Sequence, residues 1–226
     1  MSENLGFLTV IEQTPSSWTG GYLVLNGAGR PLEFHCTMPL MPDKIQQILY
    51  GDTLQPFLYG ERIAQTLIQR SKLPILSILT NFAAVLTVQT TVLSPVIYVF
   101  GESANQCDRK PVRVGLFQND DSAPQPIHEI TEELSLSLKD FGIDNAHLRT
   151  QSACSSELPT VPHVPGFDTG MWQSIRIGNR LIAAPKTEKT DWEQLIAEIK
   201  KRAQNIDLLE PFARIRLALD EAKNAA

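Results

Sequence analysis

The chain has few of the residues and motifs that mark catalytic or cofactor sites. Only three of its 226 residues are cysteines, Cys36, Cys107 and Cys154, and no two of them fall in a CxxC spacing. Their odd number and wide separation fit a reducing compartment and give no zinc signature. The sequence also has no GxSxG, HExxH, Walker or dinucleotide-binding fingerprint. We therefore predict no metal site and no cofactor.

Positive charge is also scarce. The chain carries 20 basic and 25 acidic residues, a net charge of −5, and residues 118–170 hold two basic against nine acidic side chains. No segment has the basic field of a protein that binds phosphate backbones, so nucleic acid is predicted to be an unlikely partner.

Long apolar segments are limited to one region. The start, MSENLGFLTV, has neither a basic nor a long apolar section, so no secretory signal is indicated. Between Lys72 and Glu102 lie 29 residues without formal charge, long enough to span a bilayer. Asn81, Gln89 and two prolines that bound β-branched runs favour buried strands instead. We predict a cytoplasmic protein that does not enter the membrane.

The patterning predicts an α+β fold with a mainly antiparallel, or mixed, sheet and amphipathic helices packed on it. TPSSWTGG is expected to be a loop, and 82–92 fits either a crossover helix capped by Asn81 or a further strand. A helix there would make the flanking strands parallel. Strands are expected at 5–13, 22–26, 31–38, 75–80, 95–100, 112–117, 172–177 and 180–184; helices at 43–50, 52–70, 127–141 and in two C-terminal segments that open with Thr190 and Asp207.

Composition divides the chain into three segments. Residues 1–101 are expected to form an N-terminal α+β core, and 102–170 an acidic, proline-rich segment with one strand and one helix. Residues 171–226 should add a β-hairpin and two C-terminal helices, packed on the core as one domain.

The stretch GGYLVLNGAGRPLEFHC, residues 20–36, is predicted to be a hairpin. Its glycines lead into a strand, whereas a phosphate-binding loop leads into a helix, so they indicate a tight turn. Strand alternation sets Cys36 with Leu32, Phe34 and Met38 on one face, which predicts a core position for that cysteine. Glu33 and His35 share the other face with Arg30 at its edge; this is either a solvated outer face or a site where an imidazole beside a carboxylate acts.

Four further features are candidate sites. Tyr50 and Tyr59 lie in the similar sequences LYGDT and LYGER and are candidate binding residues in different settings. His163 and Asp168 share a Pro/Gly loop of the kind that often carries catalytic residues. Cys107, close to Arg109 and Lys110, is the strongest candidate for a reactive thiol. His128 and Glu132 are spaced like half of a metal site but lack further ligands nearby.

These observations predict a non-catalytic protein-binding module, a scaffold or accessory subunit that meets a protein partner or forms a homo-oligomer. The alternatives are a hydrolase or transferase that uses His35 with Glu33 or His163 with Asp168, and a small-ligand sensor with a pocket near Tyr50 or Tyr59.

Overall fold

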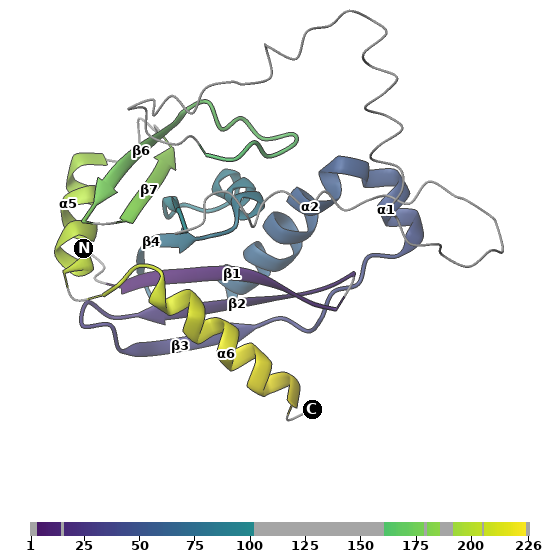
Figure 1. The fold of residues 1–226 in the computed structure, drawn as a ribbon, viewed down its shortest axis with the longest axis horizontal. Helices are drawn as coiled ribbons and strands as arrows, with labels where there is room; N and C mark the ends of the chain where they lie inside the picture. The colour runs from purple at the N-terminus through teal and green to yellow at the C-terminus, as the bar shows by residue number, and fades with distance from the viewer. Residues whose placement is uncertain are drawn as a thin grey trace, which may run out of the picture. The chain divides into compact units, whose positions relative to one another are not determined.

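The strands that the structure describes join in one mixed sheet (Figure 1). The computed structural model describes residues 4–14, 16–101, 161–178, 180–185, 192–204 and 206–224. Within these residues the sheet has seven strands in the order β3-β2-β1-β4-β5-β7-β6. They are β1 (Asn4–Thr14), β2 (Ser17–Leu25), β3 (Pro31–Cys36), β4 (Ile75–Thr80), β5 (Val96–Val99), β6 (Trp172–Ile177) and β7 (Arg180–Pro185).

Strand direction changes across this sheet. β1 pairs antiparallel with β2 and β2 with β3, but β4 runs parallel to β1 and β5 runs parallel to β4. On the far side, β7 returns antiparallel against both β5 and β6. The α+β prediction is therefore confirmed, and of the two kinds of sheet that we expected, the structure has the mixed one.

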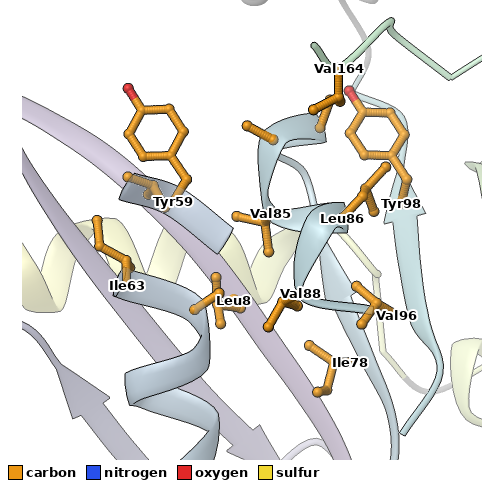
Figure 2. Packing of buried hydrophobic residues seen from close by; sticks show 14 of the residues in the cluster. Leu8, Tyr59, Ile63, Ile78, Val85, Leu86, Val88, Val96, Tyr98 and Val164 are labelled. Atoms are coloured by element: carbon orange, nitrogen blue, oxygen red, sulfur yellow. The ribbon is translucent and has the colours of Figure 1, made fainter. Parts of the chain in front are cut away.

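Helices cover both faces of the sheet. One face carries α2 (Leu54–Pro56), η2 (Phe57–Ala64), α3 (Gln65–Arg70) and η3 (Ala83–Thr90), and the other carries α5 (Trp192–Ala203) and α6 (Glu210–Asn224). The helical turns α1 (Lys44–Tyr50) and η1 (Gly51–Thr53) lead into α2 and have no buried residues. Because successive strand residues point to opposite faces, each strand supplies side chains to both layers. Leu8, Tyr22, Ile78 and Val96 belong to the cluster that contains Ile63 and Val85 on the first face, while Phe7, Leu23, Leu79 and Ile97 belong to the cluster that contains Phe212 and Ile215 on the second. Figure 2 shows part of the first cluster.

Segment 82–92 is the helical crossover between the parallel strands β4 and β5. Its residues Ala83–Thr90 form a 3₁₀ helix, so the helical alternative is correct and the strand alternative is wrong. Asn81 does not cap it; its Oδ1 accepts a hydrogen bond from Thr9 Oγ1 at 2.7 Å.

Several elements match the sequence prediction. Helix α1 lies at the predicted position; the structure adds that Asp43, the residue before its first turn, caps it, with the carboxylate accepting from Gln46 N while the Gln46 side chain accepts from Asp43 N. The hairpin β6–β7 and the amphipathic helices α5 and α6 also lie where the patterns place them. The expected strand 112–117, helix 127–141 and cap at Thr190 lie outside the described residues.

Two local predictions are wrong. The TPSSWTGG segment is not a loop, because β2 begins at Ser17 and its residues pair with β1 up to the turn. The expected single helix from Asp52 to Arg70 is instead a succession of 3₁₀, α and π turns, and Asp52 lies inside the first 3₁₀ turn rather than at a helix start.

The apolar face of β3, which we expected to be buried, is exposed, and the polar face is the one that is partly covered. Leu32, Phe34 and Met38 are 46%, 39% and 82% exposed, whereas Glu33 and His35 are half-buried. β3 is an edge strand: α6 packs on β1 and β2, while α3 reaches β3 on the polar face. Cys36 is half-buried and packs against the cluster beneath α6, at the margin of the core rather than inside it.

None of the helices in the described ranges has the length and apolar character needed to cross a bilayer.

A pair of glycines in β2 brings the two helical layers close to the sheet. Added to Gly20, a Cβ atom would overlap Cγ2 of Ile63 on η2; added to Gly21, it would overlap Cγ2 of Ile215 on α6. Neither Cβ can be accommodated without moving a buried side chain, since Ile63 and Ile215 are both fully buried. The absence of side chains at these two positions therefore sets how closely each layer approaches the strand.

We predict that Gly21→Ala lowers the free energy of unfolding by about 1–3 kcal/mol, because the new methyl group overpacks the contact with Ile215. Urea denaturation measures the change. In the background Ile215→Ala the same substitution should cost much less, since the overlapping atom is gone. Gly27→Ala is the matched control, because a Cβ there meets nothing within 4 Å; a loss at Gly27 as large as at Gly21 would contradict the explanation.

Candidate functional site

Glu33 is the centre of a hydrogen-bonded cluster on the edge strand. Cross-strand pairing sets Glu33 opposite Val24 and His35 opposite Tyr22. Glu33 Oε2 lies 3.3 Å from His35 Nε2 and accepts from Ser71 Oγ at 2.8 Å, and Glu33 Oε1 accepts from the Lys72 amide at 3.4 Å. The carboxylate thus ties the end of α3 to β3.

The hydrogen bonds around Glu33 determine the direction in which the pKa of its carboxyl moves. Burial tends to raise the pKa of Glu33, but the hydrogen bonds from Ser71 and His35 and from the Lys72 amide outweigh it and hold that pKa below the usual value. Beneath the cluster, burial and then the charge of Glu33 raise the pKa of Tyr22, so its phenol stays protonated.

The order of groups in the cluster does not match nucleophilic catalysis. In a serine–histidine–acid triad the imidazole lies between the hydroxyl and the carboxylate and takes the proton of the hydroxyl. Here the carboxylate of Glu33 occupies the middle position, and Ser71 donates to it directly. The arrangement is that of an anchor between two elements. Arg30, at the edge of the predicted site, closes the hairpin turn through its backbone, where its N–H donates to Asn26 Oδ1.

A second group of polar and aromatic side chains lines a pocket of about 450 Å³, which we call the aromatic pocket. Its wall combines residues from three separate stretches of the chain. They are Tyr50, Thr53, Pro56, Phe57, Glu61, Gln65, Thr87, Thr90, Thr91, Pro165, Gly166 and Phe167.

One wall of the aromatic pocket is a π-helix, η2. The amide of Gln65 donates to the carbonyl of Gly60 five residues earlier, which is the hydrogen bond that defines this wider helix. Phe57, Glu61 and Gln65 follow one another at intervals of four residues and all line the pocket. A Cβ at Gly60 would overlap Oγ1 of Thr87, so the glycine lets η2 lie directly against η3, which supplies the opposite polar wall. Helices of this type occur frequently at functional sites.

Aromatic rings form a second part of the wall. Tyr50 stacks on Phe57 with ring centroids 4.3 Å apart and an interplanar angle of 21°, and the Arg62 guanidinium carbon lies 5.7 Å from the centroid of the Phe57 ring. Tyr50 is 36% exposed, so part of its ring surface remains open to a ligand.

The two candidate tyrosines have different surroundings, as expected. Tyr50 lines the aromatic pocket, but Tyr59 is 2% exposed and packs edge-on against Phe82 with centroids 5.1 Å apart. Figure 2 shows Tyr59 as a member of the buried cluster, which also contains Ile63 of the same helix η2. Burial and the charge of Glu12 raise the pKa of Tyr59, and a hydrogen bond from Trp18 opposes them. Tyr59 does not line the pocket.

The loop of His163 and Asp168 contributes to the pocket through other residues. His163 is exposed, and Asp168 accepts from the amide of Gly170 at 2.8 Å, which closes a local turn. Within the described residues no hydrogen bond joins the two side chains. Pro165, Gly166 and Phe167, which lie between them, line the aromatic pocket instead. The Pro/Gly composition of this loop was the signal that marked it.

The remaining candidates cannot be placed. Cys107, His128 and Glu132 lie outside the described residues. In the part of the chain that the structure describes, no three His, Cys, Asp or Glu side chains form a group that could hold a metal ion.

A further hollow of about 660 Å³ lies where the β6–β7 hairpin meets the end of α5. Its arginine is already engaged: Arg180 donates from Nε and Nη2 to the two carboxylate oxygens of Asp207, at 3.1 and 2.9 Å. The hydrogen bonds from Arg180 hold the pKa of Asp207 below its usual value. This paired geometry joins the hairpin to the loop before α6.

Comparison with known proteins finds similarity at the level of solved structures. No protein-family model matches the chain, and no curated protein matches it. A solved structure of an endonuclease V variant from Ciona intestinalis, in complex with a 23mer DNA containing an inosine followed by a ribo-adenosine, is 13% identical with a TM-score of 0.42; the match covers 97% of this chain and 86% of that one. Endonuclease V of the same organism with a 24mer DNA is 15% identical with a TM-score of 0.41, over 97% and 87% of the two chains.

These similar structures contradict part of the sequence prediction. Both are nucleases bound to DNA, against our predictions of a non-catalytic protein-binding or scaffold module and of nucleic acid as an unlikely partner. We withdraw both predictions. At this degree of similarity the comparison assigns no activity and no residue role to this chain.

We predict that Glu33 makes stability depend on pH in the acid range. The pKa of Glu33 is lower in the folded than in the unfolded state. Its contribution to the free energy of unfolding is therefore fully present at a pH above the pKa of an unfolded glutamate, and it is lost as the pH falls through the folded-state pKa. Glu33→Gln should therefore reduce the slope of unfolding free energy against pH between about pH 5 and pH 2. Ser71→Ala, which removes one hydrogen bond, should reduce it partly. Urea denaturation across that range is the measurement, and an unchanged slope in Glu33→Gln would refute the assignment.

Proposed function

We propose that the chain binds its ligand through a planar heteroaromatic ring, of the nucleobase type, in the aromatic pocket. The observation that carries the proposal is the stacked pair of Tyr50 and Phe57 in the wall of a pocket that also presents hydrogen-bonding side chains. The base belongs either to a free nucleoside or to a nucleic-acid strand.

The size and composition of the pocket support a small planar group. A volume of about 450 Å³ falls in the range of ligand sites, and such sites combine apolar and aromatic walls with a few polar groups that fix orientation. Tyr50, Phe57 and Phe167 supply the aromatic surface, while Glu61 and Gln65 supply polar groups from the same helical face. A planar ring can stack on this aromatic surface, and stacking of a base on an aromatic side chain contributes about 1–3 kcal/mol to the binding free energy.

The charge of the lining residues indicates which part of the ligand enters. Glu61 is the one ionisable acid or base among the pocket residues that the structure describes, apart from the phenol of Tyr50. A carboxylate repels phosphate, so a phosphate group of the ligand would stay outside the pocket while the ring enters.

We predict that Tyr50→Ala weakens nucleoside binding about 5- to 150-fold, which corresponds to the loss of about 1–3 kcal/mol of stacking. Ligand-observed NMR titration with adenosine, guanosine, cytidine and uridine, and with single strands of about 12 nucleotides, measures the affinity and separates free from strand-borne bases. Tyr50→Phe keeps the ring and should retain binding.

Leu49→Ala is the control for the adjacent surface, since Leu49 is exposed on the same helix and does not line the pocket. The proposal fails if no base-containing ligand binds the wild-type protein, or if Tyr50→Ala binds as well as Leu49→Ala.

A further inference from the structure

The threonines of the aromatic pocket have already used their hydroxyl protons. Thr87 Oγ1 donates to the carbonyl of Ala84 at 3.0 Å, Thr90 Oγ1 to that of Thr87 at 3.0 Å, and Thr91 Oγ1 to that of Val88 at 3.0 Å. Thr53 Oγ1 donates in the same way to the carbonyl of Tyr50 at 2.7 Å. A hydroxyl has one proton and two lone pairs, so each of these oxygens can still accept a hydrogen bond but has no proton to donate.

Glu61 adds a further acceptor to the same pocket. It lies on η2 between Phe57 and Gln65, and a carboxylate can only accept. Within the described residues its oxygens form no hydrogen bond and no ion pair, so they are available to a ligand. The side chains that can still donate into the pocket are the amide of Gln65 and the phenol of Tyr50.

From this excess of acceptors, and resting on the proposed function, we infer that the pocket selects rings that carry an exocyclic amino group. Cytosine presents the N4 amino group as a donor where uracil presents the O4 carbonyl as an acceptor, and carboxylates are the usual partners of the cytosine amino group. The amino group can donate to Glu61 or to a threonine oxygen, whereas the carbonyl of uracil meets the same oxygens with lone pairs. A mismatched group leaves both partners without their hydrogen bond and weakens binding.

Cytidine and uridine are the sharpest probes, because the two nucleosides have the same ring size and the same sugar. The wild-type protein should bind cytidine about tenfold more tightly than uridine, as expected when one ligand donates to a charged acceptor of the pocket and the other presents a lone pair to it. In Glu61→Gln the amide can donate to the O4 carbonyl, so uridine should gain affinity and the ratio should approach one.

Asp52→Asn is the matched control, since it also removes a carboxylate close in sequence but from a residue that does not line the pocket. It should keep the wild-type ratio. Circular dichroism of each variant checks that the fold is retained. The same pair of bases presented as oligo(C) and oligo(U) of about 12 nucleotides distinguishes a strand from a free nucleoside.

The outcomes separate the two proposals. Equal affinities, or tighter binding of uridine by the wild-type protein, would overturn the selectivity but leave ring binding in place, and an unchanged ratio in Glu61→Gln would overturn the role of Glu61. If neither nucleoside and neither strand binds, both the selectivity and the proposed function fail.

Discussion

The packing of both helical layers depends on two successive glycines in strand β2, because neither has a side chain to hold a helix away from the sheet. Gly20 and Gly21 are successive residues of β2, so one opens the face that receives Ile63 and the other the face that receives Ile215. Each helical layer is seated against the same short piece of strand, with η2 on one side and α6 on the other. Side chains at these two positions would separate both layers from the sheet, and the dense packing of the two clusters would be lost.

The position of η2 against β2 also determines where the aromatic pocket forms. Ile63 positions η2 over β2, and three residues earlier Gly60 lets the same helix lie against Thr87 of η3. Phe57 and Glu61 of the π-helix η2 and Gln65 at the start of α3 then line the pocket between these elements, and the loop at Pro165–Phe167 completes its wall. A close approach of backbones in the core therefore determines where polar and aromatic groups meet at the surface.

The edge strand β3 shows how tertiary contacts reverse a simple pattern. Alternation correctly separates Glu33 and His35 from Leu32 and Phe34, because strand residues alternate whatever surrounds them. Alternation does not say which face is covered. α3 ends beside the polar face, and the bonds from Ser71 and Lys72 satisfy the Glu33 carboxylate there, which makes its partial burial tolerable. The exposed apolar face lies beyond the strands on which α6 packs.

Short-range chemistry accounts for what the sequence by itself determined: the helix at 43–50, the β6–β7 hairpin, the amphipathic helices α5 and α6, and the class of the fold. These features depend on residues within a few positions of each other. Tyr50 was identified as a candidate from the sequence, but its partners Glu61, Thr87 and Phe167 were not, because they come together only through packing across long stretches of chain. The parallel pairing of β4 with β5, the π-helix and the covered face of β3 were likewise decided by the tertiary structure, since each depends on contacts that no local pattern encodes.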